Sequence, residues 1–384
     1  MKLAIVKERA ADEARVAATP ETVKRFAGLG LEVVVERGAG AGSFMADDAY
    51  EAAGAKLVDS AQEALDGAAV VLRVVAPSDD ELARIGRGAL LIGMLSPYDD
   101  KARVAQYASA GIDAFAMELM PRISRAQSMD VLSSQSNLAG YKAVIDAAAH
   151  YGQAFPMMMT AAGTVAPARV FVLGAGVAGL QAIATARRLG AIVSATDVRP
   201  VVKEQVESLG ATFVMVESEE TADAQTAGGY AREMSDDYKR RQAELVAEHL
   251  KKQDIVITTA LIPGRPAPVL ITEEMVASMK PGSVIVDMAV ERGGNCPLAR
   301  PNEIVDHNGV SIMGMLNLPA KLAGNASSLY AKNLLNFVTP FVDKDSGKVE
   351  MNWADELVTG TGLTHEGKVV HPAFTDTPAQ QGDK

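Results

Sequence analysis

Cysteine is almost missing from this 384-residue chain. The single Cys296 excludes an intramolecular disulfide and a thiolate metal cluster. The five histidines are scattered, with no His-x-x-x-His pair, so the sequence offers no dedicated zinc site. Aromatic residues are only 5% and the formal net charge is −11, a balance that argues against binding nucleic-acid phosphates. We therefore expect no metal and no nucleic-acid partner.

Long hydrophobic runs are missing as well. No stretch of about 18 apolar residues occurs, so we expect no membrane-spanning segment. Near the start, Glu8, Arg9, Asp12 and Glu13 stand where a signal peptide needs its apolar stretch. A cytoplasmic-type soluble protein is expected. The length exceeds what one core usually holds, which predicts two domains.

Short apolar runs alternate with helical patterns, as in parallel α/β sheets. A helix is expected over Glu21–Leu29, after the start signal Thr19-Pro20. The segment Ser124–Tyr151 is expected to form one extended helix preceded by a loop, and Pro156 follows its end. The strands expected in the first third are Leu3–Val6, Glu32–Val35, Ala69–Val75, Ala89–Leu95 and Ile112–Ala116.

A second alternating block begins at Ala168. The polar segment Glu217–Asp237, which contains Gly228-Gly229, interrupts it and is too long for an ordinary connection, so we expect a mobile functional loop there. A late helix is expected over Ser327–Phe341. The strands expected in this block are Arg169–Leu173, Ile192–Ala195, Thr212–Val216, Asp254–Thr258, Ser283–Asp287 and Val310–Leu316.

The sharpest motif is VFVLGAGVAGLQAIATARRLGAIVSATD, in which an apolar strand runs into a glycine turn and then a helical pattern. Gly174 would make the tight turn, Gly176 would let the backbone approach a pyrophosphate, and Gly179 would let the helix pack close to the sheet. The free N–H groups of the helix start would then hold the phosphates. The residues assigned to a dinucleotide by this turn are Gly174, Ala175, Gly176, Val177, Ala178 and Gly179.

An acidic residue completes the dinucleotide signature. Asp197 ends the next strand, 18 residues beyond Gly179, where a carboxylate accepts from a ribose 2′-OH and repels a 2′-phosphate. This favours NAD over NADP, although Arg199 could pair with a 2′-phosphate. We assign Asp197, Val198 and Arg199 to the cofactor, and add Thr259, Ala260 and Leu261 because they end a strand at the carboxyl edge of the sheet.

Two other stretches are open to more than one interpretation. Gly38–Gly42 follows a strand but leads into no capped helix, so a permissive loop is favoured over a second nucleotide site. The polar stretch PRISRAQSMDVLSSQSN (121–137) indicates, from composition, a solvated loop before a helix capped by Asp130 or Ser133.

A family resemblance changes the interpretation of that polar stretch. The segments 8–30 and 172–197 resemble the two signatures shared by alanine dehydrogenases and nicotinamide nucleotide transhydrogenases, and TTALIPGRPAP (258–268), MKPGSVIVDMA (279–289) and GGNC (293–296) extend the match. The stretch PRISRAQSMD is specific to the transhydrogenase side. The chain resembles the NAD(H)-binding first domain, or soluble α1 subunit, of proton-translocating transhydrogenases.

This resemblance implies roles for particular residues. Arg122, Gln127 and Asp130, with Ser133 beside them, would hold the nicotinamide for hydride transfer, and Gly229 and Tyr230 would belong to a loop that closes over the nucleotide. An ordinary exposed loop tyrosine is the alternative at position 230. Hydride would pass directly from NADH bound here to NADP⁺ on a partner domain, coupled to proton translocation in the full complex.

Alanine-type dehydrogenases remain the rival enzymes. They carry a lysine in the segment resembling Arg73–Pro77 and a histidine in the segment resembling Leu91–Pro97, and this chain has neither there. Amino-acid oxidation needs a group that takes a proton, whereas ring-to-ring hydride transfer needs only rings held in contact. Arg15 matches a substrate-binding arginine of the dehydrogenases, with no evident role here. A non-catalytic NAD-binding module is the other alternative.

Together these features predict two Rossmann-like doubly wound parallel-sheet domains separated by a cleft. Residues 1–125 with 325–384 would form one, residues 138–324 the NAD(H)-binding domain, and residues 124–151 the connection. The resemblance implies a homodimer, peripheral to the inner membrane on its cytoplasmic side. Its partners would be a membrane-spanning and an NADP(H)-binding component.

Overall fold

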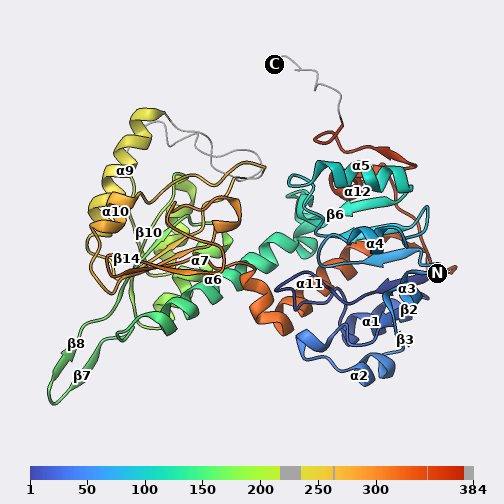
Figure 1. The fold of residues 1–384 in the computed structure, drawn as a ribbon, viewed down its shortest axis with the longest axis horizontal. Coiled ribbons are helices and arrows are strands. Elements are labelled where there is room, and N and C mark those ends of the chain that lie inside the picture. The colour runs from blue at the N-terminus through green and yellow to red at the C-terminus, as the bar shows by residue number, and fades with distance from the viewer. Residues whose placement is uncertain (217–234, 263, 344, 376–384) are drawn as a thin grey trace. The chain divides into compact units, whose positions relative to one another are not determined.

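The computed structural model describes residues 1–216, 235–262, 264–343 and 345–375. The chain divides into two compact units, unit 1 (Met1–Gln135 and Ala320–Lys384) and unit 2 (Ser136–Pro319). Each unit is built on one large sheet with helices packed against it (Figure 1). The expected fold class, with two α/β domains on parallel sheets, is confirmed.

The sheet of unit 1 has six parallel strands in the spatial order β3-β2-β1-β4-β5-β6. Most of their side chains are buried, as expected for a parallel sheet covered by helices. β3 has no counterpart among the expected strands, because its three residues are only partly buried or exposed and give no apolar run. The strands are β1 (Lys2–Ile5), β2 (Glu32–Glu36), β3 (Lys56–Val58), β4 (Val70–Leu72), β5 (Leu90–Gly93) and β6 (Asp113–Ala116).

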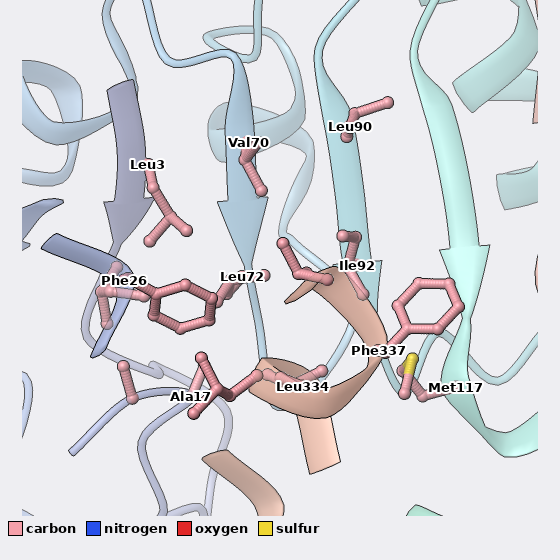
Figure 2. Close-up of a cluster of buried hydrophobic side chains, with 14 of the residues drawn as sticks. Leu3, Ala17, Phe26, Val70, Leu72, Leu90, Ile92, Met117, Leu334 and Phe337 are labelled. Atoms are coloured by element: carbon pink, nitrogen blue, oxygen red, sulfur yellow. The ribbon is translucent and has the colours of Figure 1, made fainter. Parts of the chain in front are cut away.

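Helices from both ends of the sequence cover the sheet of unit 1. The Thr19 hydroxyl caps α1, as its start signal predicts, and Pro20 occupies the first turn. Leu334 and Phe337 of α11 pack into the apolar cluster beneath Leu72 and Ile92 (Figure 2). The helices are α1 (Pro20–Gly28), α2 (Asp47–Ala52), α3 (Ala61–Leu65), α4 (Asp79–Leu82), α5 (Lys101–Ala110), α11 (Ala323–Val338) and α12 (Glu356–Thr361).

Two short antiparallel pairs complete unit 1. They follow α11 and flank α12 in the sequence, so the C-terminal part of the chain adds small ribbons to this unit rather than strands to its main sheet. The pairs are β16 (Val342–Asp343) with β17 (Lys348–Val349), and β18 (Thr364–His365) with β19 (Lys368–Val369).

The sheet of unit 2 has seven strands in the order β11-β10-β9-β12-β13-β15-β14. β14 is antiparallel to β15, which corrects the expectation of an all-parallel sheet. The cause is the turn Asn308-Gly309, where both residues adopt positive φ (54° and 82°) as a tight hairpin requires. The strands are β9 (Arg169–Leu173), β10 (Ile192–Thr196), β11 (Thr212–Phe213), β12 (Ile255–Thr258), β13 (Val284–Asp287), β14 (Ile304–His307) and β15 (Val310–Met313).

A separate hairpin, β7 (Met158–Thr160) with β8 (Gly163–Val165), extends away from this sheet (Figure 1). It has no counterpart among the expected strands, because every one of its six side chains is exposed and the segment has no buried periodicity. The helices of unit 2 are α7 (Val177–Arg188), α8 (Lys203–Ser208), α9 (Asp236–Leu250) and α10 (Glu273–Ala277).

The connection around residue 130 differs from the single long helix that the sequence suggests. A 3₁₀ segment, η3 (Ser124–Met129), precedes the 20-residue helix α6 (Val131–His150). The break is at Asp130, whose carboxylate accepts from the Ser133 N–H (2.9 Å) and hydroxyl (2.5 Å) and so caps α6. The predicted loop 217–237 is also shorter at its end, since α9 begins at Asp236.

Candidate functional site

The glycine turn after β9 has the geometry of a phosphate-binding loop. Gly174 adopts φ 99°, and a Cβ on it would lie 2.6 Å from Thr259 Oγ1. A Cβ on Gly179 would lie 1.8 Å from the Gly174 carbonyl oxygen, so this position accepts only glycine. A Cβ on Gly176 would meet nothing within 4 Å, which leaves open space beside that backbone for a ligand.

Helix α7 begins immediately after this open position. Its N-cap is Gly176, and in the described structure no side chain hydrogen-bonds to the N–H groups of its first turn. Uncapped N–H groups and the positive end of the helix dipole together attract a phosphate. Gly174–Gly179 can therefore hold a pyrophosphate, as the motif predicts.

Asp197 lies at the carboxyl end of β10, next to the turn. Its Oδ2 accepts from the Ala175 N–H (2.8 Å), which ties the acid to the phosphate loop. Arg199 donates to it from Nε (2.8 Å) and Nη2 (2.7 Å), and this bonding raises the pKa of the guanidinium. The carboxylate is 8% exposed, and Val198 beside it is partly buried.

The strand end at Thr259–Leu261 joins the same site. Thr259 Oγ1 donates to the Gly174 carbonyl (3.0 Å), so the two turns are linked directly. Ala260 is held by Asn295, whose amide accepts from the Ala260 N–H (3.1 Å) and donates to its carbonyl (2.9 Å). Leu261 is left exposed. Asn295 is fully buried and escaped the sequence interpretation, although the GGNC segment that holds it is part of the family resemblance.

A buried carboxylate supports this strand end from behind. Asp287, at the end of β13, accepts from Thr258 Oγ1 (3.1 Å) and from the Cys296 N–H (2.9 Å). Burial raises the pKa of Asp287, and the Cys296 N–H bond opposes that rise. The single cysteine is buried here as a packing residue.

The second group of predicted residues lies in unit 1. Arg122 and Gln127 are exposed, whereas Ala126 and Met129 between and after them are buried in the core. Asp130 and Ser133 bond to each other as the cap of α6, so the structural role left open for them is present. Gly229 and Tyr230 lie outside the described residues.

Unit 1 also holds a chain of buried ion pairs. Arg73 is 2% exposed and pairs with Glu8 (Nη2–Oε2 2.8 Å) and Glu81 (Nη1–Oε1 2.8 Å). Desolvation raises the pKa of Glu8, and the Arg73 charge opposes that rise. Arg15 pairs with Glu13 (Nη2–Oε2 2.7 Å) and donates to Gln135 Oε1 (2.8 Å).

The other glycine-rich stretch serves packing. A Cβ on Gly40 would lie 2.6 Å from the Tyr50 ring, and one on Gly42 would lie 2.8 Å from the Ala14 carbonyl oxygen. The Ser43 hydroxyl donates to that same carbonyl (2.8 Å). These glycines permit a close approach of backbone segments within unit 1, so their geometry differs from that of the open turn at Gly176.

Two further searches bear on the site's chemistry. Among the described residues, no group of three or more histidine, cysteine or carboxylate side chains is placed to hold a metal ion. In the same part of the chain, none of the helices combines the length and apolarity that crossing a bilayer needs.

Known proteins place the chain in a family. The model of the alanine dehydrogenase/PNT N-terminal domain matches residues 4–139 and that of the C-terminal domain residues 143–372. The first part of NAD(P) transhydrogenase subunit alpha of Rhodospirillum rubrum, a separate polypeptide, is 59% identical over 98% of this chain and 99% of its own length. Alanine dehydrogenase of Halomonas elongata is 31% identical over 98% of this chain and 96% of its own length.

A solved structure agrees with this assignment. Transhydrogenase from Sinorhizobium meliloti superposes with a TM-score of 0.88 at 55% identity, covering 96% of this chain and all of that one. The resemblance inferred from the two signatures is thereby confirmed. The chain belongs to the alanine dehydrogenase/PNT family, and its similarity is much higher to the transhydrogenase members than to the alanine dehydrogenases.

Proposed function

We propose that this chain is the NAD(H)-binding component of a proton-translocating NAD(P) transhydrogenase. The observation that carries the proposal is the turn at Gly174–Gly179, with open space at Gly176 and Asp197 bonded to its backbone. The names of the transhydrogenase relatives support the activity, and "subunit alpha" in those names supports assembly with other subunits.

The two units would divide the dinucleotide by chemistry. In unit 2 the N-terminus of α7 would hold the pyrophosphate, while Asp197 would accept from the adenosine ribose hydroxyls. In unit 1 the exposed Arg122 and Gln127, with Asp130 and Ser133, would orient the nicotinamide. Tyr230 and Gly229 would close over the bound nucleotide.

Hydride transfer between two nicotinamide rings asks little of protein acid–base groups. No proton leaves or joins the rings, so catalysis consists of holding C4 of each ring in contact and excluding water. The second nucleotide, NADP(H), would be carried by a partner domain. The chain would act as a homodimer, peripheral to the inner membrane, with a membrane-spanning partner for proton translocation.

NAD(H) is favoured over NADP(H) by the state of the acid at position 197. The Asp197 carboxylate is bonded to the Ala175 N–H and paired with Arg199, and its charge repels a 2′-phosphate. Arg199, which could otherwise attract that phosphate, is already engaged by the same carboxylate.

Alanine-type dehydrogenation is disfavoured by the residues of unit 1. Arg15 and Arg73 are buried and paired with glutamates of the same unit, so neither cation is left for a small carboxylate substrate. Neither a lysine in 73–77 nor a histidine in 91–97 supplies a proton-accepting group.

The test is hydride transfer from NADH to NADP⁺ by the purified chain, alone and mixed with the NADP(H)-binding component of a transhydrogenase. We expect activity only in the mixture. NADH binding without transfer in the mixture would favour the non-catalytic binding module, and reduction of pyruvate with ammonia by the chain alone would favour the dehydrogenase.

A further inference from the structure

The segment that carries Arg122 and Gln127 is held by side chains from the C-terminal third of the sequence. Its η3 turn runs for six residues, longer than 3₁₀ segments usually persist without support. Met129 and Ala126 are buried beneath it and supply an apolar anchor. Its polar anchors come from α11 and from the residue that starts α12, all within unit 1.

Two asparagines of α11 bind one carbonyl of the segment. Asn333 Nδ2 donates to the Ser128 carbonyl at 2.8 Å, and Asn336 Nδ2 donates to it at 3.1 Å. Asn333 is 7% exposed and its Oδ1 also accepts from the Ser134 hydroxyl (2.8 Å) in the first turn of α6. The peptide after Gln127 is therefore fixed to α11 on one side and to α6 on the other.

A forked ion pair fixes the other half of the segment. Arg125 donates from Nη1 to Asp355 Oδ2 (2.8 Å) and from Nη2 to Asp355 Oδ1 (2.6 Å). Asp355 also caps α12 by accepting from the Leu357 N–H (2.8 Å). A two-point arginine–carboxylate pair sets orientation as well as distance. Arg125 and Ser128 thus bracket Gln127 with two independent attachments.

We propose that Asp355, Asn333 and Asn336 are positioning residues for hydride transfer, acting through the backbone of 122–130 on Arg122 and Gln127. The inference rests on the proposed function of that segment. A displacement of about 1 Å in a group that orients the reacting ring can lower the rate by about 100-fold. The amide pair and the ion pair prevent that displacement.

The experiment uses the full chain mixed with the NADP(H)-binding component and measures two quantities, the single-turnover rate of hydride transfer and the Kd for NADH. The variants are Asp355→Asn, which keeps a capping oxygen for α12 but loses the charge, Arg125→Gln, and Asn333→Leu with Asn336→Leu, which keep volume. We expect each change to lower the rate about 10-fold, with the Kd for NADH within about twofold of wild type.

A matched control lies on the same helix. Lys332 of α11 pairs with Glu21 (3.2 Å), away from the segment, and Lys332→Gln is expected to leave the rate unchanged. Reversal of the pair, Arg125→Asp with Asp355→Arg, is expected to recover part of the rate lost in either single change. Fluorescence of Trp353, the chain's single tryptophan two residues before Asp355, reports whether this region keeps its fold.

The outcomes distinguish the positioning role from the proposed function. Wild-type rates in all these variants would overturn the positioning role and leave the proposed function standing. The positioning role is equally overturned if the rates fall only as far as the folded fraction does. A mixture in which even the wild-type chain transfers no hydride, although it binds NADH, would overturn the proposed function and this inference with it.

Discussion

Single residues in this molecule combine a structural contact with a proposed contact to the ligand. Asp130 caps α6 and is also assigned to the nicotinamide, and Asp197 bonds the Ala175 N–H and is also assigned to the ribose. Loss of activity in a variant of either residue would therefore be ambiguous by itself. The glycines of the turn separate the two roles, because one is open to solvent and another is enclosed.

Gly176→Ala and Gly179→Ala are expected to fail in different ways. The Gly176 Cβ would meet no atom within 4 Å, so stability should change by only a few tenths of a kcal/mol, while NADH affinity falls at least about 10-fold. The Gly179 Cβ would lie 1.8 Å from the Gly174 carbonyl oxygen, which should cost about 1–3 kcal/mol of stability. Thermal unfolding and NADH titration of both variants test this, and wild-type NADH affinity in Gly176→Ala would remove the pyrophosphate from this turn.

Asp197→Asn should weaken the preference for NADH over NADPH. An asparagine still accepts from the Ala175 N–H, but the negative charge is lost and Arg199 is released. We expect NADPH affinity to rise and NADH affinity to fall, each by about 10-fold, equivalent to about 1.4 kcal/mol. Titration with both nucleotides measures the shift. In Asp197→Asn with Arg199→Gln the gain for NADPH should disappear, and its survival would show that Arg199 is not the phosphate-binding group.

Glu118 gives the stability of the protein a predictable dependence on pH. It follows β6 and accepts from the backbone N–H groups of Leu95 (3.2 Å) and Ser96 (2.5 Å). Burial raises the pKa of Glu118 to about 7. The folded state therefore binds the proton more tightly than the unfolded state, and this group's stabilising effect is lost as pH rises from about 4.5 to 7.

Glu118→Gln removes that titration. Each unit of pKa shift corresponds to about 1.4 kcal/mol, so the wild-type chain should lose up to a few kcal/mol through this group, a change of a few degrees in Tm. Tm measured at pH 5, 6, 7 and 8 should fall less steeply in Glu118→Gln than in wild type. Parallel Tm curves for the two proteins would show that Glu118 ionises normally.

At the scale of elements, a close helix contact sets the position of the phosphate-binding helix. α6 passes α7 so closely that a Cβ on Gly140 would lie 2.0 Å from the Ala178 carbonyl oxygen. Gly140→Ala should therefore displace the first turn of α7, cost about 1–3 kcal/mol of stability and reduce NADH affinity. Gly28→Ala in α1 is the control, because its Cβ would meet nothing and helix propensity predicts a gain of about 0.5–1 kcal/mol. Equal stability in the two variants would contradict the contact.

The elements show which parts of a fold a sequence can predict. The strand β9 at Arg169–Leu173 matches its expected bounds to the residue, because a short continuous apolar run before a glycine turn is typical of a buried strand. The exposed hairpin of β7 and β8 gives no such pattern. β14 was missed although Asn308-Gly309 is a strong hairpin signal, because β14 alternates only between exposed and partly buried side chains.

The candidate site was predictable to the same degree. The glycine turn and Asp197 follow from local spacing, and the structure brings them together through the Ala175 and Thr259 contacts. Asn295 and Asp355 were out of reach because their partners lie far away in the sequence, and a single asparagine or aspartate has no local signature. The nicotinamide segment came from family resemblance, since its composition favours a solvated loop.

Within the whole molecule, the two units share a strand order that no sequence repeat reveals. In each, the second strand lies on one side of the first and the fourth on the other. Glu36 at the end of β2 accepts from the Lys7 N–H (2.9 Å), as Asp197 at the end of β10 accepts from the Ala175 N–H. Unit 1 thus keeps the acid-to-backbone contact of a dinucleotide fold.

The difference lies in the connection after the first strand. Between Val6 and Thr19 there is no glycine to open the backbone, and Arg9 pairs with Glu36 and Glu81 where unit 2 leaves space. Glu8 and Arg73 add a further pair to this group. The carboxylates outnumber the guanidinium groups, so the group repels phosphate as well as filling the space.

Each chain should therefore bind one NADH. Calorimetric titration of the wild-type chain is expected to give a stoichiometry of one, and Gly176→Ala should abolish the whole signal because the open glycine turn that follows a first strand is in unit 2. Arg9→Ala removes a guanidinium from the ion-pair group without creating a glycine turn, so it should leave both stoichiometry and affinity unchanged. A second binding event, or binding that survives in Gly176→Ala and is lost in Arg9→Ala, would place a nucleotide on unit 1. That result would mean that the strand order, rather than the glycine turn, determines where this family binds its dinucleotide.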